Sequence, residues 1–333
     1  MRRDATGRTA LQTALSPAAG KRRRLALALS VLAALGLGPA AEARAEGRVP
    51  IGAYAANDPK LVEEFEQWFG CPMDQLLVFT DQASWEGIGW PQWFINQFKA
   101  LDRPTLWSVA MIPRGSSLRE AASGRYNRYY VSAARALAET KPFADGTIRI
   151  RLGWEMNGNW FPWAAEGKEE DFIRTFRHIV DSFRSVSDKF RFEWNFNYGE
   201  RMDPATAYPG DDYVDIIGMD FYWKHEYLPR DPVAAFERIR DHRWGLRYVE
   251  NFARARGKPT AYSEWGVQGD NAAPFIKLFQ EWMAQHNVLY HNYWNSDADY
   301  AGRLSSGKWP ATARAFRETF CPASRAEAAP PRR

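Results

Sequence analysis

Short strand-like segments and longer helix-like segments alternate along most of this 333-residue chain, and that order limits the possible folds strongly. Runs rich in β-branched and aromatic residues predict eight strands, at residues 51–54, 75–80, 105–112, 147–152, 191–196, 214–219, 259–263 and 288–294. Apolar residues recur at helical spacing between several of them, at residues 61–69, 129–140, 169–186, 232–241 and 273–286. Strands that alternate with helices form a parallel sheet with crossover helices. Eight such units predict the α/β class, as a single-domain (β/α)8 or TIM barrel.

Residues 1–45 have the pattern of a secretory signal peptide with an N-terminal extension. Four basic residues at 21–24 precede an apolar run at 25–37 and a small-residue site at 43–45, after which cleavage is expected. An uncleaved membrane anchor is the alternative, but the run is shorter than the roughly 20 residues that span a bilayer. We expect export to the periplasm or out of the cell, without stable membrane association after cleavage. The tail at 322–333, rich in Ala, Pro and Arg, is expected to be disordered.

The basic balance of the whole chain comes from its first residues. Lys and Arg number 44 against 40 Asp and Glu, but eight of the former and two of the latter precede residue 46. The rest of the chain has 36 basic and 38 acidic residues, a formal charge of −2. Nucleic-acid binding depends on clustered excess positive charge, so the sequence argues against a nucleic-acid partner. Nothing in the pattern indicates an oligomer, and we expect a monomer.

The chain has two cysteines, Cys71 and Cys321, near the two ends of the predicted domain. In an oxidising compartment they can form a disulfide that joins the ends of a closed barrel, whereas two separate buried thiols are the alternative. Their spacing matches no metal or redox motif. The five histidines have no metal-ligand spacing either. We therefore expect no metal site and no cofactor.

One acidic residue, Glu155, stands among indole rings in the segment 154–163, directly after a predicted strand. A carboxyl held against apolar rings has its charged form disfavoured, so its pKa rises and it can keep a proton near neutral pH. An ordinary surface glutamate beside core aromatics is the alternative, because indoles are commonly core residues.

A second glutamate, Glu264, lies 109 residues further on, at the end of another predicted strand and before Trp265. Two carboxyl groups on different strands suit the chemistry of glycoside hydrolysis. Active sites of these barrels lie at the carboxyl ends of the strands, where both glutamates fall. Other strand ends carry polar or aromatic residues that we expect to converge on the same cleft, namely Asp81, Asn195, Asn197, Asp220, Tyr222, Trp294 and Asn295.

All fifteen tryptophans follow residue 45, and some of them are suited to bind sugars. Sugar rings present apolar C–H faces that pack on indole, while a few polar groups fix their orientation. We predict sugar platforms at Trp160, Trp163, Trp265 and Trp294. Core packing is the expectation for Trp68, Trp107, Trp244 and Trp282.

Three segments, 151–163, 208–220 and 263–266, together resemble glycoside hydrolase family 26. That family consists largely of endo-β-mannanases, with some β-glucanases and β-xylanases, among the retaining (β/α)8 glycosidases. The resemblance implies that residues 46–321 are a catalytic domain acting on a polysaccharide, with Glu155 as acid/base and Glu264 as nucleophile. It also places Arg151 at the arginine before the acid/base and Tyr222 at a tyrosine that holds the nucleophile. For a retaining mechanism the two carboxyl groups should lie about 5 to 5.5 Å apart.

Nearby residues receive supporting roles in this interpretation. Arg151 is expected to keep Glu264 ionised through its charge, and Asn197 or Tyr222 to bind substrate hydroxyls or the nucleophile. We therefore count Arg151, Asn197 and Tyr222, with the four tryptophan platforms, as substrate-binding residues.

The sequence departs from the family at Trp154, where the family usually has His directly before the acid/base. Ser263-Glu264-Trp265 also replaces the more usual Ser-Glu-Phe. A bulky ring in place of a polar group leaves the substrate open between β-mannan and another polymer, such as a β-glucan, a xylan or a bacterial exopolysaccharide. A barrel that has lost catalysis and only binds carbohydrate is a further alternative, since it would keep the aromatic platforms.

Overall fold

A computed structural model describes residues 48–199 and 201–321 of the chain. The predicted signal peptide at 1–45 and the predicted tail at 322–333 lie outside the described residues. Within the described ranges, no helix combines the length and the apolar character needed to cross a membrane.

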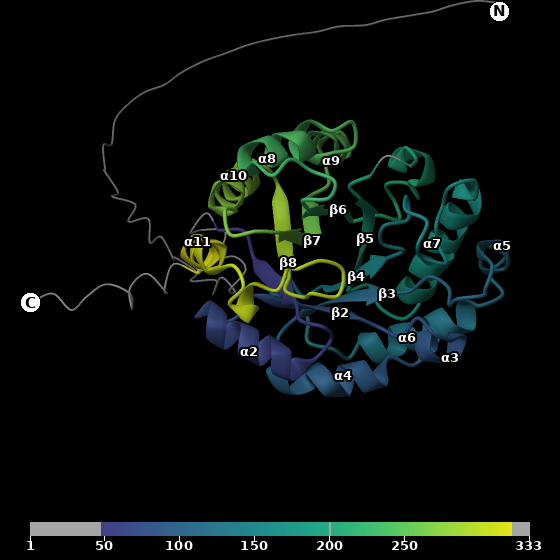
Figure 1. Cartoon of the computed structure of the whole chain (residues 1–333). Helices are drawn as coiled ribbons and strands as arrows, with labels where there is room; N and C mark the ends of the chain where they lie inside the picture. The colour runs from purple at the N-terminus through teal and green to yellow at the C-terminus, as the bar shows by residue number, and fades with distance from the viewer. Residues whose placement is uncertain (1–47, 200, 322–333) are drawn as a thin grey trace, which may run out of the picture. The chain divides into compact units, whose positions relative to one another are not determined.

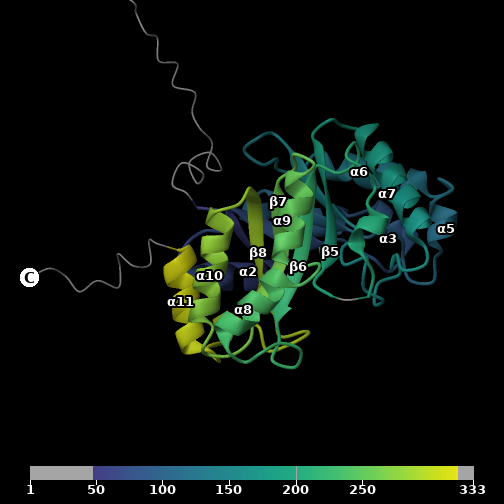
Figure 2. The same ribbon diagram turned by 90° about the horizontal axis from the view of Figure 1, so that it is seen from above.

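Eight parallel strands close into one barrel in chain order, so that β1 pairs with both β2 and β8. Figure 1 shows the strands surrounded by helices, and Figure 2 shows the same barrel from above. The strands are β1 (Ile51–Tyr54), β2 (Gln75–Phe79), β3 (Thr105–Val109), β4 (Ile148–Leu152), β5 (Phe190–Asn197), β6 (Ile216–Trp223), β7 (Thr260–Val267) and β8 (Val288–Trp294). The prediction of a (β/α)8 barrel is confirmed.

The helices form the outer layer because each buries one apolar stripe. In α7 (Glu169–Arg184), for example, Phe172, Phe176, Ile179 and Phe183 recur at helical spacing and are buried. The other helices are α2 (Pro59–Phe69), α3 (Trp85–Gly89), α4 (Gln92–Phe98), α5 (Leu118–Ala121), α6 (Asn127–Leu137), α8 (Pro232–Asp241), α9 (Leu246–Arg254), α10 (Ala273–Ala284) and α11 (Pro310–Phe320), with short 3-10 turns η1 (Lys99–Leu101), η2 (Pro204–Ala207) and η3 (Leu304–Ser306).

In the segment that ends at Trp265, strand β7 contains one extra residue relative to the facing segments of β6 and β8. Between Tyr262 and Trp265 it advances three residues while β8 advances two, from His291 to Tyr293. Against β6 the register shifts in the same region. Such a bulge interrupts the alternation of side chains along a strand.

The bulge places two consecutive side chains, Ser263 and Glu264, on the inner side of the barrel. Ser263 donates to Glu193 and Glu264 accepts from Arg151, both within the barrel. Trp265 faces outward instead, where its ring packs against the ring of Phe279 on α10. Without the extra residue the side chains of Glu264 and Trp265 would exchange faces.

A disulfide joins Cys71 and Cys321, whose Cα atoms lie 5.8 Å apart. Cys71 follows α2 and Cys321 follows α11, so the bond links the first and last helices of the described barrel. The sequence left this pairing open against separate thiols.

Candidate active site

A cavity of about 710 Å³ opens at the carboxyl ends of the strands. Residues from the ends of six strands and the loops after them line it: Phe79, Trp154, Glu155, Trp160, Phe161, Asn197, Tyr198, Gly199, Tyr222, Lys224, Tyr227, Leu228, Arg238, Glu264, Trp294 and Asp299. We call this cavity the cleft. It contains both predicted glutamates, together with Trp160, Asn197, Tyr222 and Trp294.

Glu155 lies in a tight turn after β4 that uses backbone conformations rarely adopted by side-chain-bearing residues. Its φ angle is 53°, and Gly153 two residues earlier has φ 54°. A side chain at Gly153 would also collide with Met111 and Phe172, so glycine is required there. A glutamate in the left-handed region costs free energy, and such strained residues cluster at functional sites.

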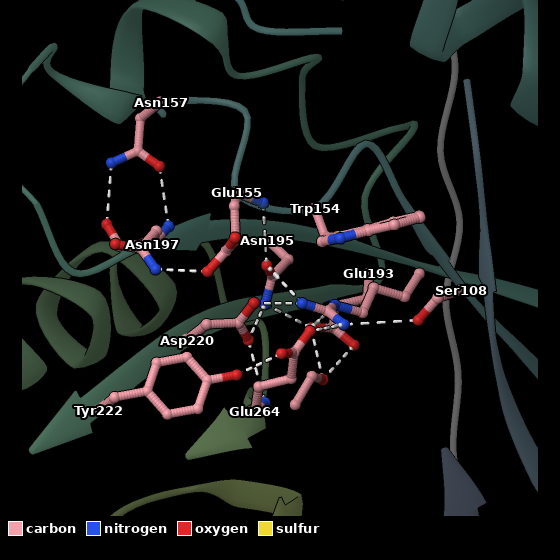
Figure 3. Close-up of polar contacts among 12 residues, drawn as sticks. Ser108, Trp154, Glu155, Asn157, Glu193, Asn195, Asn197, Asp220, Tyr222 and Glu264 are labelled. Atoms are coloured by element: carbon pink, nitrogen blue, oxygen red, sulfur yellow. Dashed lines mark hydrogen bonds and ion pairs between the residues drawn. The ribbon is translucent and has the colours of Figure 1, made fainter. Parts of the chain in front are cut away.

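Two side chains donate hydrogen bonds to the Glu155 carboxyl group. Trp160 Nε1 lies 2.7 Å from Oε2, and Asn197 Nδ2 donates to Oε1. Figure 3 shows the Asn197 side chain directed at this carboxyl. The Glu155 backbone N–H in turn donates to Asn195 Oδ1 at 3.3 Å. Glu155 is therefore held in one orientation, facing the cleft.

Burial and the charge of Glu264 raise the pKa of Glu155 to about 7. The hydrogen bonds from Trp160 and Asn197 and the charge of Arg151 lower this pKa and limit the rise. A carboxyl group with this pKa exchanges a proton readily near neutral pH, which is what a general acid and base requires.

Glu264 has a different set of partners, which include a cation and a hydroxyl donor. Arg151 Nη1 lies 2.6 Å from Oε1, and the Tyr222 hydroxyl donates to Oε2, as Figure 3 shows. Burial and the negative charge of Glu264 raise the pKa of Tyr222, so the phenol keeps the proton that it donates. The Glu264 backbone N–H also donates to Asp220 Oδ1 at 3.0 Å.

The guanidinium of Arg151 is fully buried between two carboxylates, Glu264 and Asp220. Burial by itself would lower the pKa of Arg151, but the charges of Asp220, Glu264 and Glu193 outweigh burial and raise it. Arg151 thus stays a cation beneath the cleft. The prediction that it binds substrate is wrong, because its side chain is enclosed and does not line the cleft.

Asn195 and Glu193 on β5 support these residues from inside the barrel. Asn195 Oδ1 accepts from Arg151, and its amide nitrogen donates to both Asp220 and Glu193. Glu193 accepts from Ser263, and from Tyr290 at 2.7 Å. Glu193 is not among the site residues predicted from the sequence. Its signal is the alternation in β5, where Glu193, Asn195 and Asn197 separate Phe192, Trp194 and Phe196.

Two of the four predicted sugar platforms line the cleft and two do not. Trp160 is 47% exposed, and Trp294 stacks on Tyr54 with ring centroids 4.1 Å apart. The predictions for Trp163 and Trp265 are wrong, because both rings are fully buried. Trp163 is covered by Phe161, which stacks on it, and its Nε1 donates to the backbone carbonyl of Trp154. Trp265 is turned to the outer face by the β7 bulge.

Asn195 and Asp220 were predicted to join the cleft but lie beneath it, where both contact Arg151. Two other predicted strand-end residues, Asp81 and Asn295, also do not line the cleft. Asp81 accepts from the backbone N–H of Ala83 in its own turn, and Asn295 bonds to Ser305. Both side chains organise loops.

Trp154, the residue before Glu155, forms part of the cleft wall. Its ring packs edge-to-face with those of Phe79, Phe161 and Trp163, at centroid distances of 5.1, 5.2 and 4.5 Å. The wall beside Glu155 is therefore apolar.

The described residues contain no group of three or more His, Cys, Asp and Glu side chains placed to hold a metal ion. The cleft provides two carboxyl groups with different surroundings. Glu155 can hold a proton near pH 7, and Glu264 is bound by the Arg151 cation. Facing one cleft, the pair combines a proton donor with a nucleophile.

Comparison with known proteins identifies the family of this chain. The model of glycosyl hydrolase family 26 matches residues 120–296, more than half of the chain, and the matched segment includes both Glu155 and Glu264. The chain belongs to glycosyl hydrolase family 26. The resemblance inferred from the sequence is thereby confirmed, and so is the assignment to the glycoside hydrolases at the level of the family.

The chain spans less than a fifth of the length of two curated relatives that it matches. A mannan endo-1,4-beta-mannosidase of Bifidobacterium adolescentis is 30% identical over 157 residues, covering 44% of this chain and 15% of that protein. Endoglucanase H of Acetivibrio thermocellus is 38% identical over 184 residues, covering 52% of this chain and 19% of that protein.

Solved structures of other family 26 proteins share the fold. A β-mannanase from Bacteroides ovatus superposes with a TM-score of 0.57 at 14% identity, covering 84% of this chain and 88% of that one. GH26C from a Muricauda species superposes with a TM-score of 0.61 at 18% identity, covering 85% of this chain and 88% of that one.

Proposed function

We propose that this family 26 chain hydrolyses internal linkages of a β-linked polysaccharide, of the β-mannan type, with retention of anomeric configuration. The observation that carries the proposal is the contrast between two carboxyl groups in one cleft. Burial raises the pKa of Glu155 to about 7, whereas Glu264 is held by the Arg151 cation and the Tyr222 hydroxyl. Environments that separate two carboxyl groups in this way assign the acid and the nucleophile.

In the first step, protonated Glu155 gives its proton to the glycosidic oxygen as the bond from that oxygen to the anomeric carbon breaks. The Glu264 carboxylate attacks the same carbon and forms a covalent glycosyl ester. In the second step, Glu155 takes a proton from water, and the water oxygen displaces Glu264 from the anomeric carbon. One water is consumed, and both carboxyl groups return to their starting states.

Sugar rings would be held by Trp160 and Trp294, which line the cleft together with the two glutamates. Asn197 would reach substrate from its position beside Glu155. We further propose that the protein is exported, since a disulfide such as that between Cys71 and Cys321 persists in oxidising compartments.

A β-glucan or β-xylan is the second candidate substrate, and Trp154 favours it. An apolar ring lines the cleft where the family usually has a histidine, so the contact that this histidine would make is replaced. Two relatives have names of this kind: one is named as an endoglucanase, and another, from a Vibrio species, as a beta-1,3-xylanase at 24% identity.

Reducing-sugar release tests the proposal. The purified protein is incubated with mannan, glucomannan, xylan, mixed-linkage β-glucan and acidic exopolysaccharides, alongside Glu155→Ala and Glu264→Ala. Activity on one polymer that both variants lose supports the two-carboxylate mechanism, and proton NMR of the first-formed anomer tests retention. A folded protein that hydrolyses none of them but binds one would support the non-catalytic carbohydrate-binding alternative.

A further inference from the structure

A second cavity lies in the outer helical layer between α4 and α6, and no residue that lines the cleft contributes to it. Its volume is about 770 Å³, comparable with the cleft. We call it the α4–α6 groove and use six of its lining residues below: Trp90, Gln92, Asn96, Trp107, Arg135 and Glu139. Figure 1 shows α4 and α6 on the same side of the barrel.

Trp107 of β3 forms part of the groove wall and has an unsatisfied hydrogen-bond donor. Its side chain is 2% exposed, and its Nε1 has no acceptor among the described residues. A buried N–H without an acceptor costs about 1–3 kcal/mol. An oxygen-bearing ligand in the groove would remove that cost, because the indole donates and cannot accept.

Trp90 provides an exposed ring at the same groove. It directly follows α3, precedes Pro91, and is 65% exposed. Trp93, one helical turn later, is similarly exposed at 63% but does not line the groove. An exposed indole beside a cavity is suited to pack the C–H face of a sugar ring.

Polar side chains complete the groove, and the charged ones among them are four basic and two acidic residues. Gln92 donates to Asn96 at 2.8 Å, which leaves the Gln92 carbonyl and an Asn96 N–H for ligand hydroxyls. Arg135 of α6 and Glu139, two residues after that helix ends, add a cation and an anion, both exposed. Two of the other basic residues are in ion pairs, Lys141 with Asp102 at 2.8 Å and Arg103 with Glu66 at 3.6 Å, and Lys99 is the fourth. Nucleic acids and other polyanions require clustered positive charge, so this lining favours a neutral hydroxyl-rich ligand.

We infer that the α4–α6 groove is a second carbohydrate-binding site, which takes a stretch of the neutral β-linked polysaccharide that the cleft is proposed to cleave. The inference rests on the proposed function for the identity of the ligand. A polymer reaches both sites of one molecule, so that binding in the groove raises the effective concentration of the chain near the cleft. A short oligosaccharide gains nothing from the groove.

Affinity gel electrophoresis in gels containing each polysaccharide tests this site. All proteins carry Glu264→Gln, so that the polymer is not degraded during the run. Trp90→Ala should weaken retardation at least fivefold. Trp107→Phe, which replaces the indole and its N–H by a smaller aromatic ring, should weaken retardation in the same direction. Trp93→Ala is the matched control and should migrate like the parent. Thermal unfolding of each variant establishes that it is folded.

Equal retardation of the Trp90→Ala and Trp93→Ala proteins would overturn the inference. So would concentration-dependent dimerisation that Trp90→Ala abolishes, because the groove would then receive a second copy of the chain. Hydrolysis by the protein with native Glu264 separates the two proposals. If the protein hydrolyses a polymer but Trp90→Ala does not change retardation, only the groove site is rejected. If Trp90→Ala weakens retardation but no polymer is hydrolysed, only the catalytic proposal is rejected. Neither retardation nor hydrolysis on any polymer rejects both.

Discussion

Arg151 and Glu264 are 113 residues apart in sequence, yet Nη1 of the arginine lies 2.6 Å from Oε1 of the glutamate beneath the cleft. The same guanidinium donates to Asp220, so one fully buried cation holds two carboxylates. Breaking a buried ion pair by removing one partner costs about 3–5 kcal/mol, because the remaining charge is left uncompensated. The fold and the candidate nucleophile therefore depend on the same contact.

We expect Arg151→Lys to reduce kcat strongly, by about 100-fold, because an ammonium group lacks the planar fork that holds both carboxylates. Arg149→Lys is the matched control. Arg149 lies on the same strand, and its ionic partner Asp145 is half-exposed, so its exchange should change kcat less than about twofold. Steady-state kinetics and urea unfolding of both variants measure the two effects. Equal losses in the two variants would contradict this account of Arg151.

The activity should fall as the pH rises through about 7, because Glu155 then loses the proton that it must donate. Hydrogen bonds from Trp160 and Asn197 lower the pKa of Glu155, so removing either bond raises it. In Asn197→Ala and Trp160→Phe the fall in kcat/KM should therefore move to higher pH. Trp294→Phe alters a cleft ring whose Nε1 has no hydrogen-bond acceptor among the described residues, and it should leave the pH of the fall unchanged. A shift to lower pH in the first two variants would contradict the assignment of Glu155.

The fold followed from the sequence because strands buried on both faces leave a strong apolar signal. The predicted limits of β1 and β8 agree with the structure, while β7 continues past its predicted end at Ser263 to Val267. The prediction stopped before Glu264 because a charged residue ordinarily ends an apolar run. In the structure this residue remains inside the sheet because Arg151 and Tyr222 bind its carboxylate.

The site was less completely predictable, for reasons that concern long-range contacts. A glutamate beside indoles and a second one on another strand could be recognised locally, whereas Glu193 belongs to no short motif and its partners Ser263 and Tyr290 lie 70 and 97 residues away. Trp265 was misplaced because a bulge is set by register with the neighbouring strands, and the sequence of β7 alone does not reveal it.

Substitution of Trp265 should mainly reduce stability, whereas substitution of Trp294 should mainly weaken ligand binding. Trp265→Ala empties a fully buried site among Phe279, Phe316 and Tyr293, and should reduce the free energy of unfolding by about 3–5 kcal/mol. Trp294→Ala should destabilise less and should weaken oligosaccharide binding by about tenfold, as expected for the loss of an aromatic contact. Urea unfolding and calorimetric titration with an oligosaccharide separate the two. A Trp265→Ala protein of unchanged stability would contradict the outward placement of this ring.

The disulfide should contribute substantially to stability, because Cys71 and Cys321 are separated by 250 positions in sequence. In the chain-entropy model, closing a loop of this size disfavours the unfolded state, and we expect loss of the bond to cost about 2–5 kcal/mol. The double variant Cys71→Ser, Cys321→Ser should show a lower Tm and unchanged kcat at 25 °C, since neither cysteine lines the cleft. Adding reductant should lower the Tm of the parent protein and leave that of the double variant unchanged. An equal response of both proteins would exclude the bond as the cause.

Glu155 should make the folded state less stable as the pH rises, which is the cost of keeping a proton donor in a buried site. Its pKa in the folded chain is about 7, against an ordinary value of 4.5, so between these values the folded state binds more protons than the unfolded state. Stability then decreases with rising pH, by up to about 3 kcal/mol in total. Glu155→Gln removes the titrating group, so the stability of the native protein relative to this variant should decline between pH 4 and pH 8.

Urea unfolding across that range measures the decline. The control is Glu139→Gln, which removes an exposed carboxyl on the outer layer. Parallel pH–stability curves for the native protein and Glu155→Gln would show that this carboxyl keeps an ordinary affinity for its proton, and the proposed acid would have to be sought elsewhere in the cleft.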